Sequence, residues 1–404
     1  MPHVLPLAIV GASARSAAAS AVRAGFQPIA ADLFADADLR HIATATRISP
    51  YPEGLLDWLR TIEPPAWMYT GAIENHPELV DQMAWIAPLW GNPGDVLARV
   101  RSPWELADVL GAAGLLFPET RATADGLPQD GSWLAKTYRG ASGSGVREHV
   151  GWVESHETHH PHFQRRIAGV PISAVFVAAG GAATLLGVTR QLVGDAWLGA
   201  HGFRYAGSIG PVPLAASIRT EIAQTGSVLA NAFELVGLFG ADMILDGRQV
   251  WTVEVNPRYT ASVEIIERAT GVQAVALHAA ACGWLGSSRP PLRGGALEPP
   301  GPFGPGRSAE PRPQPPVTAS LVHGKAILFA RRDVVIAPNF AEATLAEALR
   351  TPWPTLADIS PAGTRIEQGR PVLTVFAEGA SDEDIERQLR RRVADLEQTL
   401  YADP

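Results

Sequence analysis

The sequence predicts an α/β protein, α+β overall, in which a Rossmann-like parallel sheet precedes a larger domain and a small β-rich C-terminal domain. Three observations support this fold class. Residues 4–32 read as a strand, a small-residue helix and a second strand, the unit of a parallel sheet. Apolar and polar residues alternate over 240–256, which is typical of antiparallel strands. From Gly286 to Pro316, ten of 31 residues are proline, so this segment cannot build a core.

These observations divide the chain into four parts. They are an N-terminal Rossmann-like domain, 1–92, a central domain, 93–285, a proline- and glycine-rich linker, 286–316, and a C-terminal domain, 317–404. The C-terminal domain contains predicted strands over 319–330 and 370–377 and ends in a helix that Ser381 caps. The apolar face of that helix consists of Ile385, Leu389, Val393, Leu396 and Leu400.

Composition excludes several classes of protein. The formal charge of -8 and the pI near 5.8 argue against a nucleic-acid partner, and the basic residues form no stripe. The single cysteine, Cys282, cannot form an intrachain disulfide, which fits a reducing compartment. No apolar run approaches the roughly 18 residues of a membrane helix. We therefore expect a cytoplasmic protein without nucleic-acid or membrane partners, and assembly as a homodimer stays open.

The first strand and helix resemble part of a dinucleotide-binding site. A dehydrogenase would place Gly-x-Gly-x-x-Gly after the strand and an acid about 20 residues farther on. Gly11 and Asp32 fit this pattern, but Ser13 and Ser16 stand where the second and third glycines belong. The incomplete fingerprint argues against nicotinamide binding.

Acids and an amide interrupt the alternation in residues 240–256, which read as two strands joined at 246–248. Glu254 and Asn256 share a face because they are two residues apart. A loop with an odd number of residues, such as the three-residue bulged type, adds Asp242 to that face, whereas an even loop places it opposite. The apolar residues favour the odd loop, which gathers them on the other face: Met243, Leu245, Val253 and Val255. Three oxygen donors suit Mg²⁺, and a solvated hairpin face is the alternative.

The segment Glu254-Val-Asn-Pro-Arg258, with Asp242 upstream, resembles the metal-binding end of the ATP-grasp superfamily. Members of that superfamily make acyl phosphates from carboxylates and ATP. The resemblance implies a central ATP-grasp fold and ATP and Mg²⁺ as cofactors, with Mn²⁺ as an alternative metal. It implies that Asp242, Glu254 and Asn256 hold the metal. Arg258 would be catalytic and would face the transferred phosphoryl group or the acyl phosphate.

A strand over 133–136 carries Lys136 into a glycine-rich turn. Glycines let backbone approach a ligand closely, and successive N–H groups can cradle phosphate oxygens while a lysine supplies charge. The spacing is not that of a P-loop, and a mobile surface hairpin is the alternative. The block resembles the ATP-grasp strand and loop that close over the phosphates. The resemblance makes Lys136 catalytic and nucleotide-binding, and makes Gly143, Ser144 and Gly145 nucleotide contacts.

Residues 162–173 resemble the ATP-grasp hinge whose backbone binds adenine. The resemblance implies nucleotide contacts from Gln164, Arg165 and Ile167. The family often has an acid in this hinge, whereas this chain has an arginine pair. A second departure is Arg101, where many members carry a lysine, because arginine replaces the charge but not the geometry.

A rival metal site is His-Glu-x-x-His, which His156, Glu157 and His160 formally satisfy. In zinc proteases the two histidines share a helix face and the glutamate is the general base. Pro161 follows at once and few apolar residues flank the motif, so a helix is disfavoured there. A solvated connection between strands is the preferred interpretation.

The resemblance predicts an ATP-dependent carboxylate–amine ligase that forms ADP through an acyl phosphate. Its ligands would be ATP, a small-molecule carboxylate and an amine. The motifs at 171–178, 186–191 and 254–262 are most similar to the tyramine-glutamate ligase group, which implies joining glutamate or a related amino acid to an amine in cofactor biosynthesis. The alternatives are a bicarbonate-dependent carboxylase, since carboxyaminoimidazole ribonucleotide synthase shares the layout, and a non-catalytic nucleotide-binding regulator.

Four further residues are candidates for substrate contacts. Arg190 and Arg204 could bind a carboxylate, because a bidentate arginine contact is the usual anchor, and ordinary surface loop is the alternative. Glu74 and Asn75 end a predicted strand and are either site residues or a helix cap.

Overall fold

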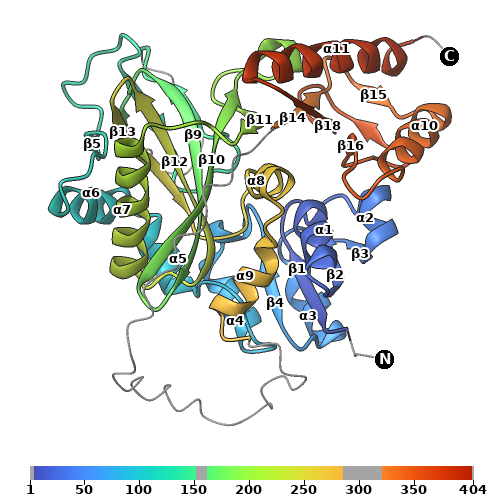
Figure 1. Ribbon diagram of the computed structural model, residues 1–404, viewed down its shortest axis with the longest axis horizontal. Coiled ribbons are helices and arrows are strands. Elements are labelled where there is room, and N and C mark those ends of the chain that lie inside the picture. The colour runs from blue at the N-terminus through green and yellow to red at the C-terminus, as the bar shows by residue number, and fades with distance from the viewer. Residues whose placement is uncertain (1–3, 152–161, 285–320, 403–404) are drawn as a thin grey trace.

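The computed structural model describes residues 4–151, 162–284 and 321–402 (Figure 1). The predicted linker, 286–316, and the His-rich motif at 156–160 lie outside the described residues. Within the described ranges, no helix is both long enough and apolar enough to cross a membrane.

A parallel sheet with the strand order β3-β2-β1-β4 forms the N-terminal part. Its strands are β1 (Pro6–Val10), β2 (Gln27–Asp32), β3 (Thr44–Arg47) and β4 (Trp67–Tyr69). Its helices are α1 (Arg15–Arg23), α2 (Ala37–Ile42), α3 (Gly54–Ile62), the 3-10 turn η1 (Ile73–Asn75) and α4 (Pro77–Ala84). The predicted Rossmann-like unit is confirmed. The strand order reverses between β1 and β4, and the loops that follow these two strands are joined by a hydrogen bond from the Ala12 amide to the Gly71 carbonyl at 2.9 Å.

A long antiparallel sheet forms the centre, in the order β13-β12-β9-β10-β11-β14-β18-β16 (Figure 1). Its first five strands in the chain are β9 (Val170–Ala179), β10 (Ala182–Val193), β11 (Tyr205–Gly210), β12 (Gly237–Asp246) and β13 (Gln249–Asn256). The helices α7 (Ala216–Phe233), α8 (Val263–Thr270) and α9 (Ala274–Ala281) cover it, and η2 (Ala196–Leu198) lies between β10 and β11.

Both faces of this sheet are buried around β9. Ala174, Phe176 and Ala178 pack in one cluster with α7, whereas Val175 packs with α8 and α9 on the other side. Phe176 stacks on Phe239 of β12 with the ring centroids 4.8 Å apart. Since both faces are covered, β9 is apolar without interruption over its centre.

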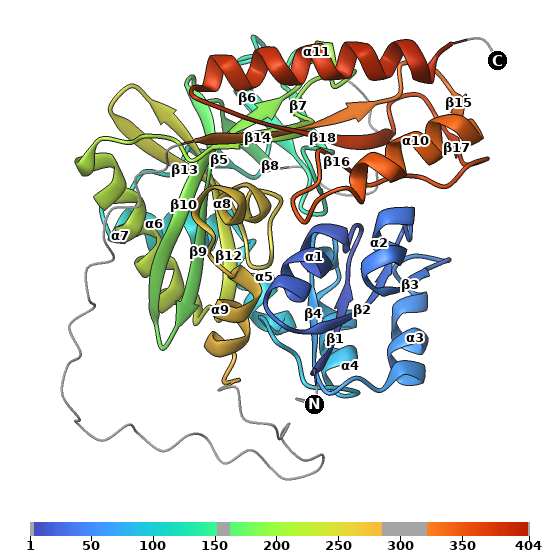
Figure 2. The ribbon, with the colours of Figure 1, turned by 45° about the vertical axis from the view of Figure 1, so that its right-hand side comes forward.

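A second, smaller sheet with the order β5-β8-β6-β7 lies over the β12–β13 end of the large sheet (Figure 2). Its strands are β5 (Thr120–Arg121), β6 (Trp133–Lys136), β7 (Val146–Glu148) and β8 (His162–Arg165). The helices α5 (Gly94–Val100) and α6 (Pro103–Ala112) lead into it. Ser102 caps α6 by accepting a hydrogen bond from the Glu105 amide.

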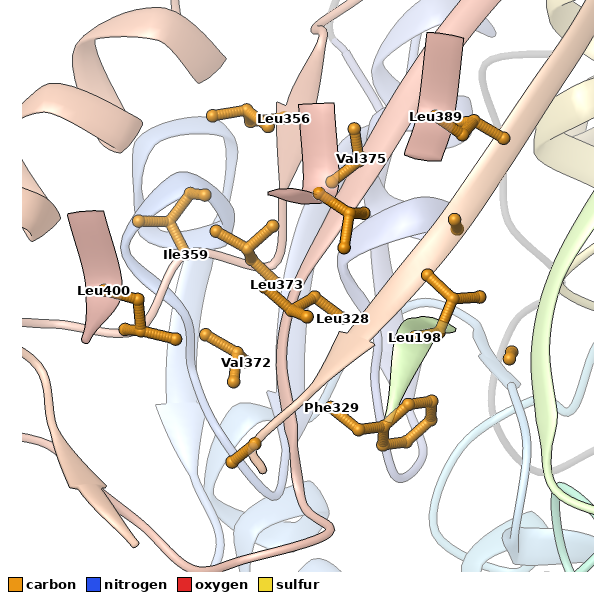
Figure 3. Packing of buried hydrophobic residues seen from close by; sticks show 14 of the residues in the cluster. Leu198, Leu328, Phe329, Leu356, Ile359, Val372, Leu373, Val375, Leu389 and Leu400 are labelled. Atoms are coloured by element: carbon orange, nitrogen blue, oxygen red, sulfur yellow. The ribbon is translucent and has the colours of Figure 1, made fainter. Parts of the chain in front are cut away.

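The C-terminal part extends the large sheet. Its elements are β14 (Val322–Phe329), β15 (Val334–Val335), α10 (Pro338–Ala348), β16 (Leu356–Ala357), β17 (Arg365–Ile366), β18 (Pro371–Gly379) and α11 (Asp382–Leu400). As predicted, Ser381 caps α11, accepting a hydrogen bond from the Asp384 amide at 3.2 Å. Leu389 of α11 packs with Leu328, Leu373 and Val375 of the sheet (Figure 3).

Three of these strands, β14, β18 and β16, join the large sheet because β14 pairs with β11, whereas β15 and β17 pair with each other in a separate sheet of two strands. The pairing covers β11, which would otherwise be an edge strand with unpaired backbone groups. Strand alternation reports which face of a strand is buried but not which distant strand will pair with it.

Candidate active site

The β12–β13 hairpin brings Asp242 and Glu254 together by a route that differs from the predicted one. The loop is even, since Asp246 pairs with Gln249 across Gly247 and Arg248, so the predicted three-residue loop is wrong. A bulge compensates for it. The pairing register of β12 and β13 shifts next to Asp242, so β13 has one extra residue there. Asp242 pairs with Glu254, and the two acids therefore share a face of the sheet.

Asn256 completes this cluster, because its Nδ2 donates to Asp242 Oδ2 at 3.0 Å. Gln191 Nε2 of β10 donates to Asp242 Oδ1, also at 3.0 Å. Burial raises the pKa of Asp242 to about 6, and the negative charge of Glu254 adds to the shift. A cation would relieve that repulsion.

The donor set fits a hard divalent cation that also binds substrate phosphates. Two carboxylates and one amide oxygen are the oxygen ligands that Mg²⁺ prefers, and Mg²⁺ usually takes only one or two carboxylates from the protein. In the described part of the chain, no three His, Cys, Asp or Glu side chains gather as a metal site. A cation at Asp242 and Glu254 would therefore depend on Asn256 and on oxygens from a ligand.

Lys136 faces this hairpin from the small sheet. Its Nζ donates to Gln164 Oε1 at 2.7 Å and to the Val253 carbonyl at 3.4 Å. Burial lowers the pKa of Lys136, while the charges of Glu254 and Asp242 oppose that change. The structure therefore places Lys136 between the hinge strand β8 and the bulge of the β12–β13 hairpin.

The glycine-rich turn lies against two other parts of the molecule, η1 and the segment 203–205. The Asn75 side chain donates to the Gly140 carbonyl at 3.3 Å, and the Tyr205 amide donates to the Ser142 carbonyl at 3.1 Å. Gly143 has a φ of +77°, and a Cβ there would overlap the Phe203 carbonyl. Glycine is thus required by both conformation and close approach.

The structure divides the predicted hinge contacts between two places. Gln164 binds Lys136, whereas Arg165, its neighbour on β8, points to the opposite face. Arg165 and Ile167 border a cavity of about 570 Å³, whose other lining residues include Phe117, Glu119 and Trp251.

Arg258 joins the metal hairpin to the N-terminal sheet. It donates to Asn256 Oδ1 at 2.9 Å and to Glu74 Oε1 at 2.7 Å. Arg101 lies 3.5 Å from the same oxygen of Glu74 and 3.8 Å from Glu254. Glu74 thus pairs with two arginines of the candidate site and caps neither η1 nor α4. The clue in the sequence was its place just after a parallel strand.

The comparison with known families agrees with this geometry. A model of the ATP-grasp domain matches residues 100–262, which include Lys136, Asp242, Glu254 and Asn256. The chain contains an ATP-grasp domain. No curated protein sequence matches the chain.

Several solved structures share the fold over nearly the whole chain. The L-amino acid ligase from Bacillus licheniformis is 14% identical, with a TM-score of 0.64 and 98% of both chains covered. Carboxyaminoimidazole ribonucleotide synthase from Aspergillus clavatus, crystallised with ATP, is 13% identical with a TM-score of 0.66, covering 99% of this chain and 100% of that one. Biotin carboxylase from Campylobacter jejuni is 11% identical with a TM-score of 0.64, covering 96% and 90%.

The two predicted carboxylate binders, Arg190 and Arg204, contact the C-terminal part. Arg190 forms ion pairs with Asp382 and Glu386 of α11, both at 3.3 Å. Arg204 donates to the Gly369 carbonyl. Carboxylate binding by either arginine stays a prediction, and no local pattern around these arginines reveals these C-terminal partners.

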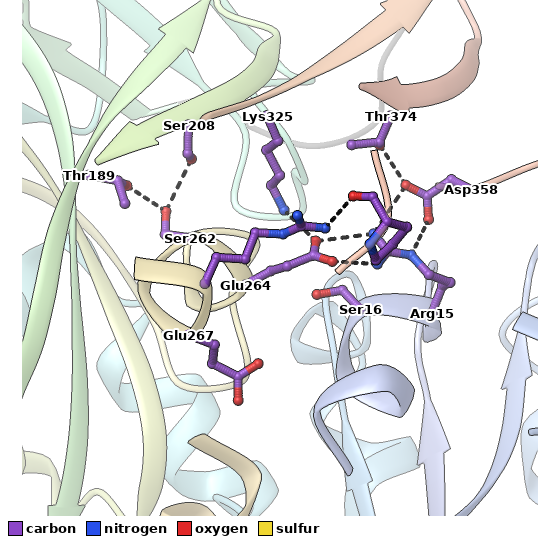
Figure 4. Close-up of polar contacts among 12 residues, drawn as sticks. Arg15, Ser16, Thr189, Ser208, Ser262, Glu264, Glu267, Lys325, Asp358 and Thr374 are labelled. Atoms are coloured by element: carbon purple, nitrogen blue, oxygen red, sulfur yellow. Dashed lines mark hydrogen bonds and ion pairs between the residues drawn. The ribbon is translucent and has the colours of Figure 1, made fainter. Parts of the chain in front are cut away.

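A buried ion cluster fixes the other domains around the ATP-grasp domain (Figure 4). Arg15 of α1 donates to Glu264 of α8 at 3.1 Å and to Asp358 at 3.0 Å, and Lys325 of β14 lies 3.4 Å from Glu264. Burial alone would raise the pKa of Glu264, but the charges of Arg15 and Lys325 hold it well below its usual range. The cluster links the three parts of the chain at one point.

Asp32, the acid of the incomplete dinucleotide fingerprint, has a structural role. One oxygen accepts a hydrogen bond from the Ala14 amide at 2.9 Å, and the other accepts from the amides of Phe34 and Ala35 at 3.0 and 2.6 Å. Both oxygens are committed to backbone, which argues further against binding of a ribose at this position.

Proposed function

We propose that this protein is an ATP-dependent carboxylate–amine ligase that works through an acyl phosphate. The observation that supports it most is the convergence of Asp242, Glu254 and Asn256 opposite Lys136, with Arg258 beside them, inside an ATP-grasp domain. Such a constellation suits ATP with Mg²⁺, or Mn²⁺ in its place.

In this proposal the protein contributes positioning and electrostatics. A carboxylate oxygen of the substrate attacks the γ-phosphorus of ATP, the bond from that phosphorus to the bridging oxygen breaks, and ADP leaves. Asp242, Glu254 and Asn256 would hold the metal, which neutralises phosphate charge when bound. Lys136 supplies positive charge on the hinge side, and Arg258 does so on the side of the N-terminal sheet.

The second half-reaction needs an amine. Its nitrogen attacks the carbonyl carbon of the acyl phosphate, the carbon–oxygen bond to phosphate breaks, and the nitrogen loses a proton to solvent. An acyl phosphate is open to hydrolysis, so water must be kept from it. The turn at 140–145 lies where it could do this, between Asn75 and Tyr205. A tyramine-glutamate type of reaction, with a role in cofactor biosynthesis, is the finer form of this proposal.

A panel assay of ADP release tests the proposal. The panel combines α-amino acids as carboxylates with aliphatic and aromatic monoamines, and a parallel series replaces the amine by bicarbonate. We expect slow ADP release with carboxylate alone and a rise with one class of amine. Asp242→Asn, which removes a charge from the metal cluster, is the control for contaminating ATPase activity.

If ADP release depended on bicarbonate and no amine stimulated it, the carboxylase alternative would replace the ligase proposal. That alternative has independent support, because one similar structure is of a carboxyaminoimidazole ribonucleotide synthase. Absence of ADP release under all conditions, with MgATP binding intact, would favour a nucleotide-binding regulator.

A further inference from the structure

Beside Arg258, three polar atoms on the N-terminal side of the cleft have no hydrogen-bond partner. They are Glu74 Oε2, Asn75 Oδ1 and the Tyr51 hydroxyl, and each is shielded from solvent. Glu74 is only 3% exposed. A buried polar atom left unpaired is costly, so a group of them in a cleft calls for a ligand.

The three atoms lie in one neighbourhood. Asn75 follows Glu74 in η1, and Arg101 contacts both the Glu74 carboxylate and the Gly140 carbonyl to which Asn75 donates, each at 3.5 Å. Tyr51 packs against the core cluster that contains Ile73, the residue before Glu74. Burial raises the pKa of the Tyr51 hydroxyl, and the charge of Glu74 adds to the shift.

The position of this group in the fold is that of a ligand site. It follows β4, next to the point where the strand order of the parallel sheet reverses, which is where ligands bind in open α/β sheets. Gly71 in the same loop lies against Arg258, since a Cβ there would be 3.5 Å from the guanidinium carbon. Ala72 next to it has a φ of 79°, a strained backbone conformation of the kind that persists at functional sites.

The chemistry of the open atoms identifies the ligand. A carboxylate oxygen and an amide oxygen only accept hydrogen bonds, and a tyrosine hydroxyl can accept one. The orientation of the Asn75 amide is fixed, because its nitrogen already donates to Gly140. A primary ammonium offers three N–H donors and a positive charge, and it would satisfy all three acceptors.

One open donor lies beside the same carboxylate. Arg101 Nη1 has no hydrogen bond and is 3.5 Å from Glu74 Oε1, whereas Arg101 Nη2 lies 3.8 Å from Glu254. The Arg101 guanidinium thus stands between Glu74 and the metal hairpin.

We propose that Glu74, Asn75 and Tyr51 bind the ammonium group of a substrate, so that the amine partner of the reaction is a primary amine. This inference rests on the proposed ligase function and deepens it. It also separates this chain from an enzyme whose second substrate is bicarbonate, an anion that Glu74 would repel.

The test uses the amine found in the ADP-release panel and the variant Glu74→Gln. Glutamine can still accept the hydrogen bond from Arg258, but it has lost the charge that binds an ammonium. We expect the KM for the amine to rise at least about tenfold, the effect of losing one charge-assisted hydrogen bond, while the KM for MgATP changes by less than about twofold. Tyr51→Phe should raise the KM for the amine by a smaller factor.

Glu78→Gln is the matched control, because Glu78 is exposed on α4, four residues from Glu74. Both KM values should match those of wild type in this variant. An unchanged KM for the amine in Glu74→Gln would overturn the inference. So would a parallel rise in the KM for MgATP, because Glu74 would then act only through Arg258.

The inference stays testable if the ligase proposal fails. Should no amine stimulate ADP release, calorimetric titration of the same primary amines, each paired with the alcohol of the same carbon skeleton, decides it. Binding of amines but not of alcohols to wild type, lost in Glu74→Gln, supports an ammonium site without ligase chemistry. No binding to wild type, or equal binding to both proteins, overturns the site.

Discussion

Replacing Lys136 by alanine should cut turnover by about 10² or more while the fold persists. The side chain is held in place before any ligand arrives, by hydrogen bonds to Gln164 at 2.7 Å and to the Val253 carbonyl at 3.4 Å. Removing one preorganised electrostatic donor typically costs about 10²–10³ in kcat, or about 3–4 kcal/mol of transition-state stabilisation. Steady-state ADP release at saturating substrates measures it.

The Lys136→Ala variant should also lose some stability. The variant leaves the Gln164 amide oxygen and the Val253 carbonyl without Lys136, at about 1–3 kcal/mol for each group that stays buried and unpaired. Part of that cost is returned, because burial disfavours the charged form of Lys136. Lys136→Met, which keeps the apolar stem, controls for packing. Turnover within threefold of wild type in either variant would refute the assignment, provided the urea midpoints show a folded protein.

Three further predictions concern the lid, the metal cluster and the ion cluster. Backbone amide hydrogens of 140–145 should exchange with solvent more slowly in the presence of MgATP, because the phosphates add hydrogen bonds to these amides. Equal protection with and without MgATP, once binding is confirmed, would contradict a lid. The Mg²⁺ concentration for half-maximal activity should rise as the pH falls below about 6, because Asp242 must lose its proton to bind metal, and a flat profile would exclude Asp242 as a ligand. Glu264→Gln should lower the free energy of unfolding by about 3–5 kcal/mol, since it leaves buried Lys325 uncompensated and removes one of the acidic partners of Arg15. Glu119→Gln, from an exposed ion pair, should cost at most about 1 kcal/mol. The Glu264 effect should be complete above about pH 4.5 and fade at lower pH, because the folded-state pKa is depressed, and an unchanged urea midpoint at pH 7 would refute it.

The metal hairpin shows what alternation can and cannot predict. The residue types around Asp242 and Glu254 identified the shared face correctly, because the apolar residues on the other face must be buried. The loop length was wrong. A two-residue turn followed by a strand bulge and a three-residue turn without a strand bulge both place the two acids on the same face of the hairpin. The sequence pattern therefore cannot distinguish these two arrangements.

Contacts between residues far apart in the chain were the second feature that the sequence could not predict. The cap at Ser381 and the buried face of α11 follow from local spacing, and the structure has both. The ion pairs of Arg190 with α11, and the pairing of β14 with β11, join segments that are far apart in the chain. Nothing in the local pattern around Arg190 distinguishes a substrate contact from an ion pair with a distant helix.

Arg101 shows how a departure from the family pattern can have a structural consequence. A lysine there would offer a single charged nitrogen, whereas the guanidinium spans several partners at once. It lies near Glu74 and Glu254, and it also contacts the Tyr138 and Gly140 carbonyls at 3.3 and 3.5 Å. Phosphate oxygens entering the site would compete with those carbonyls for the same N–H groups. Nucleotide binding and movement of the glycine-rich turn would then be coupled through one side chain, which a lysine could not do with the same reach.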